Sequence, residues 1–227
     1  MNPCIIWATQ RSRSTLVRQI LELWSDWPMA DDEPFDPAVF DGSGPHWQFG
    51  WIACRPEAEW PMHLRQVCDE GWIIKHVYDL LPLNFNLALV RAADASGYRH
   101  IHLDRLDALA RLVSLGVAIS SCRWTRDQHG KYQGQPLNVA WLIARHNEAK
   151  RQWRAISEKL PLCFELRSER LNTTSDFERL SRFLHVDHAR WRETLPRINE
   201  MVRTGGQDTA ALRPRVPNVA ELRRALA

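Results

Sequence analysis

The sequence lacks the features that mark membrane, disulfide-rich or zinc-binding proteins. No apolar run approaches the roughly 18–20 residues that a membrane-spanning helix needs, so no transmembrane segment is expected. The five cysteines are widely spaced and form no C-x-x-C pair, which indicates reduced thiols and neither a disulfide framework nor a zinc site. The chain does not open on a basic segment followed by an apolar stretch, so we expect a cytoplasmic protein.

An excess of charge of one sign is also missing. The chain has 30 Lys and Arg against 27 Asp and Glu, a formal net charge of +3, so nucleic acid is not an expected partner. A local basic site for a small anion remains open. We find no internal repeat and no low-complexity block, and 227 residues with 44% hydrophobic side chains suit a single domain over 1–227.

Short apolar runs alternate with segments of helical periodicity along the chain. The pattern predicts strands over 4–8, 71–77, 98–103 and 162–166. It predicts helices over 14–25, 83–92, 106–119 and 137–159, one more around 177–184, and a short helix at the end of the tail. This alternation favours an α/β fold of three layers, in which helices flank a central, mainly parallel sheet. Ligands of such sheets bind at the carboxyl ends of the strands.

The first strand, a polar loop and a helix together suggest an anion site. The loop Thr9–Arg13 joins the strand to a helix that begins near Ser14, and helix N-termini present free amides and a positive dipole end. The pattern G-x-x-x-x-G-K-[ST] is absent, so an ATP or GTP hydrolase is not expected. The alternative, that these side chains only cap a surface helix, stays open.

The segment Gln10–Leu16, with the sequence Q-R-S-R-S-T-L, resembles a known loop. It is similar to the 5′-phosphosulfate loop of sulfotransferases that use 3′-phosphoadenosine 5′-phosphosulfate (PAPS), commonly Q-R-S-G-S-T-L in the bacterial trehalose-type branch. The resemblance implies a P-loop-like fold, PAPS as cosubstrate, and a catalytic contribution from Arg11. It also implies that PAPS is bound by Arg11, Ser12, Arg13, Ser14 and Thr15. Arg13 replaces the usual glycine, so it either strains the turn at positive φ or adds charge near the sulfonate.

A second segment resembles the 3′-phosphate motif of the same family. In Ile101–Asp107 and the helix that follows, an arginine comes just after a strand, an aspartate follows it, and a serine lies two helical turns on. The resemblance implies that Arg105 and Ser114 bind the 3′-phosphate of the nucleotide. Asp107 lies in the first turn of the helix, where we expect it to act as a cap.

The catalytic base is expected after the first helix. Glu33-Pro34-Phe35-Asp36 occupies the place of a G-E-P-x-E segment in the trehalose-type branch, whose second glutamate is the base. The resemblance therefore implies that Asp36 is the base and that Glu33 orients the acceptor or is structural. An acidic, solvated loop is the alternative. Three histidines are rival bases because histidine titrates near neutrality: His46, His63 and His76.

The remaining candidates concern the acceptor side. Gly71–Lys75 resembles the family's G-x-W-x-x-K strand, so Lys75 is expected either to contact the phosphosulfate or acceptor or to be a solvated strand end. The loop region 26–63 is assigned to the acceptor side, where Trp47, Trp51 and Trp60 either line the acceptor site or pack on the core.

The function implied by this resemblance is sulfuryl transfer to a hydroxyl of a carbohydrate, glycolipid or other small acceptor. No metal is expected, because arginine and lysine can neutralise the leaving phosphate. A homodimer is one compatible arrangement. Two other functions stay open: a small-molecule kinase on the same fold, and a nucleotide-binding protein without catalysis.

Overall fold

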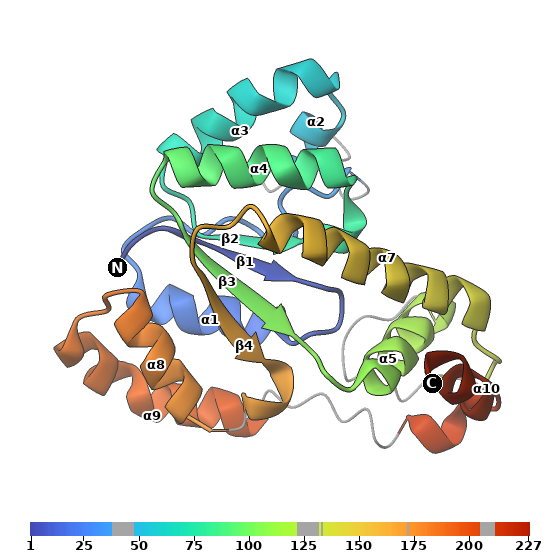
Figure 1. Cartoon of the computed structure of the whole chain (residues 1–227). Helices are drawn as coiled ribbons and strands as arrows, with labels where there is room; N and C mark the ends of the chain where they lie inside the picture. Colours follow the sequence, from blue (N-terminus) through green and yellow to red (C-terminus); the bar gives the residue numbers. More distant parts are fainter. Residues whose placement is uncertain (38–47, 122–131, 133, 172, 205–211) are drawn as a thin grey trace.

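The computed structural model of the chain describes residues 1–37, 48–121, 132, 134–171, 173–204 and 212–227. At its centre lies a four-stranded sheet in the order β2-β1-β3-β4, and all three strand pairs are parallel. The strands are β1 (Cys4–Ala8), β2 (Ile74–Val77), β3 (Arg99–Asp104) and β4 (Cys163–Arg167). Helices cover both faces of the sheet (Figure 1). The predicted α/β fold with a central parallel sheet is confirmed.

Strand β1 is the axis of this arrangement because it has a neighbour on each side. Ile6 pairs with Lys75 of β2 and with Ile101 of β3, and all five residues of β1 are buried. Strands of a parallel sheet that is covered on both faces consist almost wholly of apolar residues. This explains why Cys4–Ala8 is a continuous apolar run in the sequence.

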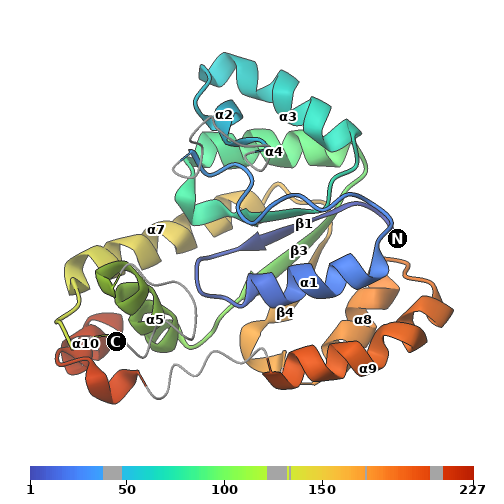
Figure 2. The same ribbon diagram turned by 180° about the vertical axis from the view of Figure 1, so that it is seen from behind.

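One face of the sheet is covered by three helices, which Figure 2 shows from behind. They are α1 (Ser14–Trp24), α8 (Ser175–Phe183) and α9 (His188–Thr204). The core on this face includes Ile6 and Leu103 from the strands together with Ile20 from α1. Trp24 of α1 stands edge-on to Trp191 of α9, with ring centroids 5.7 Å apart. The apolar spacing of α1 is therefore the spacing of its sheet-facing side.

The opposite face carries α3 (Trp60–Asp69), α4 (Leu83–Ala95) and α7 (Val139–Ser157). Trp60 is buried in this core, where its ring lies 5.1 Å from that of Phe85. Trp51 lies against the ring of His63 at 4.7 Å. Of the two alternatives for the tryptophans, packing on the core holds for Trp60, whereas Trp47 lies outside the described residues.

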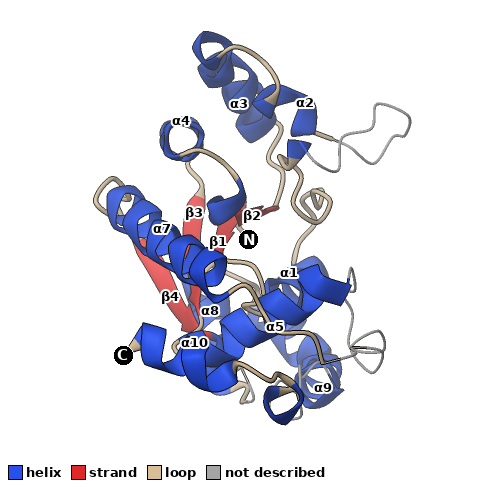
Figure 3. Ribbon diagram, turned by 90° about the vertical axis from the view of Figure 1, so that its right-hand side faces the viewer, coloured by secondary structure: helices blue, strands red, loops and turns tan. Residues whose placement is uncertain are grey.

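A third apolar cluster lies beyond the carboxyl ends of the strands. It joins α5 (Ala108–Ser121), the first turns of α7 and the C-terminal α10 (Val219–Leu226), as Figures 1 and 3 show. Leu112, Leu142 and Leu222 are among its buried members. Helix α7 begins in this cluster and runs back over the sheet. It therefore crosses the carboxyl ends of the strands.

Three helices differ from the sequence expectation. Helix α2 (Gly50–Ala53) and the start of α3 lie within 26–63, so that region is not entirely loop. Helix α9 was not predicted at all. Its composition is strongly charged and it contains Pro196, a residue that usually ends a helix. Its few buried residues, Trp191, Ile198 and Val202, give too weak a periodic signal in the sequence.

Substitution of Gly71, in the turn before β2, tests whether the backbone there requires glycine. Its φ is +79°, and a Cβ atom at this position would lie 2.4 Å from Cζ3 of Trp27. Gly71→Ala is expected to destabilise the protein by about 2 kcal/mol, because backbone strain and a clash add together. Gly97 has φ of +72° and open space around it, so Gly97→Ala should cost about 1 kcal/mol from strain alone. Urea unfolding of both variants measures the difference, and equal losses would contradict the clash.

Candidate functional site

The topology of the sheet places the candidate site at the loop after β1. The connection from β1 through α1 leads to β2 on one side of β1. The connection from β2 through α4 returns over the other face to β3, on the opposite side of β1. From β3 the chain leads through α5 and α7 to β4, away from β1. The chain therefore diverges at the carboxyl ends of β1 and β3, the position at which open parallel sheets bind their ligands.

The loop after β1 has an uncommon backbone conformation. Arg11 has φ of 67°, and Arg13 has φ of 69° and ψ of 24°, so both are left-handed without being glycine. Each such residue costs on the order of 1–3 kcal/mol, and they cluster at binding sites. Ser12 is buried, and its hydroxyl donates to the carbonyl oxygen of Thr9 over 2.8 Å. Left-handed residues in such a turn can direct successive backbone amides to one side, where they bind an anion.

Arg13 therefore adopts the conformation for which glycine is the usual residue. Its backbone caps helix α1, and its Nη1 donates to the carbonyl oxygen of Ser168 after β4, over 3.2 Å. Burial lowers the pKa of Arg13, and the carboxylate of Glu169 opposes that shift. Of the two alternatives for Arg13, positive φ is thus observed, and its side chain is directed towards the end of β4.

Helix α1 begins at Ser14 without a hydrogen bond from a capping side chain. Ser14 is buried and Thr15 is exposed. The first amides of a helix have no partner within the helix, and the dipole makes this end positive. The start of α1 therefore provides donors beside the loop.

Arg11, Arg105 and Ser114 are brought together by hydrogen bonds. Arg105 Nη1 donates to the carbonyl oxygen of Arg11 over 2.9 Å, and Arg11 Nε donates to Ser114 Oγ over 2.9 Å. Burial and the nearby charge of Arg105 lower the pKa of Arg11 to about 10, with Glu33 acting in the opposite direction. Two partly buried guanidinium groups that repel each other favour the binding of an anion between or beside them.

Asp107 caps helix α5, as predicted. Its Oδ1 accepts from the backbone N–H of Ala110 over 2.8 Å, and its other oxygen pairs with Arg213. The amides of Leu106 and Asp107 in turn donate to the carboxylate of Glu169. The turn after β3 is thereby fixed to the segment after β4 and to the C-terminal region.

Lys75 lies within an acidic group on the α1 side of the sheet. Only 3% of its side chain is exposed, and its Nζ is 2.9 Å from Asp32 Oδ1 and 3.7 Å from Glu33 Oε1. Lys75 is therefore not a solvated strand end. Asp36 is half-buried, and its backbone N–H closes a turn on the carbonyl oxygen of Glu33 over 2.9 Å.

The rival histidines lie elsewhere. His76 follows Lys75 and points to the opposite face of the sheet, where it is buried and bonded to Asn86. His63 lies on α3 beside Glu59, with Nε2 to Oε2 at 3.8 Å. His46 lies outside the described residues. Neither described histidine is connected by a hydrogen bond to the loop Thr9–Arg13.

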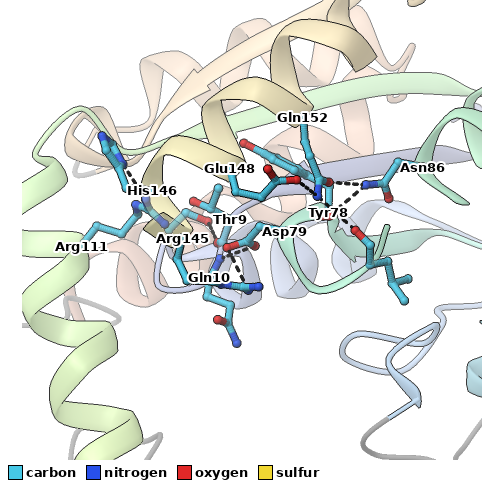
Figure 4. Close-up of polar contacts among 12 residues, drawn as sticks. Thr9, Gln10, Tyr78, Asp79, Asn86, Arg111, Arg145, His146, Glu148 and Gln152 are labelled. Carbon is cyan, nitrogen blue, oxygen red and sulfur yellow. Dashed lines mark hydrogen bonds and ion pairs between the residues drawn. The ribbon is translucent and has the colours of Figure 1, made fainter. Parts of the chain in front are cut away.

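Sequence reasoning missed a group of charged residues over the loop, which Figure 4 shows. Asp79 is 2% exposed and accepts from the backbone N–H of Gln10 and from Arg145 Nη2, both over 3.4 Å. Burial raises the pKa of Asp79, and the charges of Arg145 and Arg111 act against this. Arg111 is also buried, and its Nη2 donates to His146 Nδ1 over 2.9 Å. Burial and Arg111 lower the pKa of His146 to about 4, so it accepts this bond as a neutral ring.

Part of this group left a trace in the sequence. Asp79 is the second residue after the predicted second strand, and Arg111 lies one helical turn before Ser114 on the same face of α5. Arg145 and His146 gave no such signal, because only the packing of α7 decides which of its residues reach the loop.

A buried polar network continues from this group along α7. Asn86 Nδ2 donates to the carbonyl oxygen of Tyr78 over 2.9 Å and to Gln152 Oε1 over 2.7 Å. Asn86 Oδ1 lies 2.6 Å from His76 Nε2. Gln152 extends the network to Glu148 over 2.8 Å (Figure 4). Because the network joins β2, α4 and α7, it fixes the position of α7 over the candidate site.

The buried His76 should make stability depend on pH. Burial lowers its pKa to about 4, against about 6.5 in an unfolded chain. Between these values the unfolded state binds more protons, so stability falls as pH drops from 6.5 towards 4. We expect His76 to account for a loss of about 2 kcal/mol between pH 7 and pH 4.5. Urea unfolding at both pH values should show this loss reduced in His76→Gln and retained in His188→Gln, an exposed control; equal losses would contradict it.

The described residues contain no group of three or more His, Cys, Asp or Glu side chains that could hold a metal ion. Within them Cys4, Cys54, Cys68 and Cys163 are free, and Cys122 lies outside them. No helix in the described ranges is both long enough and apolar enough to cross a membrane. Comparison of the chain with protein-family models, curated proteins and solved structures found no match.

Proposed function

We propose that the chain is a sulfotransferase that moves a sulfuryl group from PAPS to the hydroxyl of a small acceptor. One observation carries the proposal: the hydrogen bonds of Arg11 join the loop after β1 to Arg105 and Ser114. These residues come from the two segments that resemble the 5′-phosphosulfate and 3′-phosphate motifs. A single ligand with anionic groups at both its 5′ and 3′ positions would occupy such a site.

The proposed reaction is an in-line displacement. The acceptor hydroxyl oxygen forms a bond to sulfur, and the bond between sulfur and the 5′-phosphate oxygen breaks. The electron pair of that bond leaves with adenosine 3′,5′-bisphosphate, and the hydroxyl proton passes to a base. Positioning and charge stabilisation supply most of the acceleration in such transfers.

In the proposal, different residues bind the phosphosulfate, bind the 3′-phosphate and stabilise the leaving group. The backbone cradle from Arg11 to Thr15, including Ser12, Arg13 and Ser14, holds the phosphosulfate. Arg105 and Ser114 hold the 3′-phosphate. Arg11 and Lys75 provide positive charge where the leaving phosphate gains negative charge. A carbohydrate or glycolipid hydroxyl is the proposed acceptor, by family resemblance.

Calorimetry with adenosine 3′,5′-bisphosphate tests the proposal. We expect micromolar binding, with adenosine 5′-monophosphate about 30-fold weaker, since charge-assisted hydrogen bonds to the 3′-phosphate contribute about 2 kcal/mol. ATP with magnesium is the second comparison. Equal or tighter binding of ATP would overturn the proposal in favour of a kinase. Binding of the bisphosphate without turnover on any acceptor would favour a nucleotide-binding protein without catalysis.

A further inference from the structure

Glu33 has a backbone conformation that the other acidic residues beside the loop do not share. Its φ is 58°, which makes it one of four non-glycine residues with positive φ in the described ranges, together with Arg11, Arg13 and His185. It also precedes Pro34, which restricts its backbone further. Two of the four, Arg11 and Arg13, lie in the loop after β1, and the charge of Glu33 acts on Arg11. A left-handed residue costs free energy unless its surroundings hold it in place.

The charges around Glu33 come from several elements. Lys75 Nζ of β2 lies 3.7 Å from its Oε1, and the charge of Glu33 also acts on Arg11 of the loop. Burial raises the pKa of Glu33; Lys75 lowers it, whereas Asp36, Asp32 and Asp79 raise it further. Glu33 thus interacts electrostatically with the phosphosulfate loop, the acidic segment and the end of β2.

Accessibility distinguishes Glu33 from the buried Asp79. Its side chain is 32% exposed, so a small acceptor can approach it, whereas the Asp79 side chain is 1% exposed. Asp32 is more exposed, but it forms the closer ion pair with Lys75 at 2.9 Å. Lys75 stays paired with Asp32 when Glu33 takes up a proton. The buried ammonium group of Lys75 therefore keeps a counter-charge.

We infer that Glu33, in place of Asp36, accepts the proton of the acceptor hydroxyl. This inference rests on the proposed function. As the acceptor oxygen forms its bond to sulfur and the bond from sulfur to the 5′-phosphate oxygen breaks, the hydroxyl proton moves to a carboxylate oxygen of Glu33. Solvent then takes the proton from Glu33. The backbone N–H of Asp36 closes the turn on the Glu33 carbonyl, and this contact does not depend on the Asp36 carboxylate.

The kinetic test compares Glu33→Gln with Asp36→Asn as the matched variant. Transfer from sulfur-labelled PAPS is measured against a panel of sugar and phenol acceptors and against water, which releases inorganic sulfate. Loss of a general base should slow transfer by about 100-fold or more in Glu33→Gln. Transfer by Asp36→Asn should stay within about 3-fold of the unmodified protein. Glu33→Gln should bind adenosine 3′,5′-bisphosphate at least as tightly as the unmodified protein, because it removes negative charge near the anionic ligand. A large loss in Asp36→Asn with activity kept in Glu33→Gln would overturn the inference.

A spectroscopic test needs no acceptor. Carbon-13 labelling of glutamate carboxyl groups follows each titration, and the resonance missing from Glu33→Gln identifies Glu33. We expect a pKa above the ordinary value of about 4.3. Binding of adenosine 3′,5′-bisphosphate should raise it further, because the ligand adds negative charge nearby. A Glu33 titration that the ligand leaves unchanged would place the carboxylate away from the reacting atoms and refute the inference.

The outcomes separate the two proposals. If the unmodified protein does not bind the bisphosphate, the proposed function itself fails. If it binds the ligand but Glu33→Gln transfers normally, or the Glu33 titration is unmoved, only the role of Glu33 fails. Should Glu33→Gln fold poorly in thermal unfolding, Glu33→Asp keeps the carboxylate with a shorter reach, and a partial loss of transfer at full nucleotide affinity is expected.

Discussion

Arg105→Ala is expected to weaken the binding of adenosine 3′,5′-bisphosphate by about 100-fold, measured by calorimetry. Two or more charge-assisted hydrogen bonds would be lost, and each contributes roughly 1.5–3 kcal/mol before compensation. In the proposed complex Arg105 binds the 3′-phosphate while its Nη1 continues to hold the Arg11 carbonyl. Removal of this side chain therefore affects both the ligand and the loop.

The comparison with adenosine 5′-monophosphate separates these two effects. If Arg105 binds the 3′-phosphate, Arg105→Ala should keep only a small preference for the bisphosphate over the monophosphate, because Ser114 alone would still contact the 3′-phosphate. If Arg105 only positions the loop, both ligands should weaken by the same factor, and that result would contradict the assignment. Arg91→Ala is the matched control, because Arg91 is exposed on α4 near the amino end of β3, and it should leave both affinities unchanged.

Asn86→Ala should reduce the free energy of unfolding by about 3–5 kcal/mol, since each buried polar group left without a partner costs about 1–3 kcal/mol. Asn86 is fully buried, and the substitution removes its bonds to His76, Tyr78 and Gln152. In a chain of this length we expect the Tm to fall by roughly 6–15 °C. Differential scanning calorimetry measures the change.

Asn84→Ala provides the control on the same helix. Asn84 is exposed, and its contact with Glu57 is long, at 3.5 Å. Its loss should change stability by less than about 0.5 kcal/mol. Similar effects of the two substitutions would show that helix propensity at α4 matters more than the buried network.

The strands could be predicted from the sequence with small errors at their ends. Cys4–Ala8 was predicted exactly as observed, and β3 and β4 each differ by one residue at either end. Only β2 is clearly shorter than its predicted range, because the chain before Ile74 makes a turn at Gly71. Buried parallel strands are apolar runs between polar loops, a signal that needs no tertiary information.

The candidate site could be predicted only in part. The two motifs around Arg11 and Arg105 were visible because each lies on a short segment that joins a strand to a helix. The pair of Asp79 with Arg145 joins residues 66 positions apart, and no local pattern indicates which face of α7 meets the loop. Packing decides which side of a helix faces its neighbours.

The sequence by itself determined the α/β class, the order of the main elements and the placement of the loop Thr9–Arg13 before a helix. Hydrophobic periodicity is local, so these features follow from residues close together in the chain. Only the tertiary structure decided that Arg11, Arg13 and Glu33 adopt positive φ. L-residues other than glycine rarely take that conformation, and long-range contacts are needed to hold them in it.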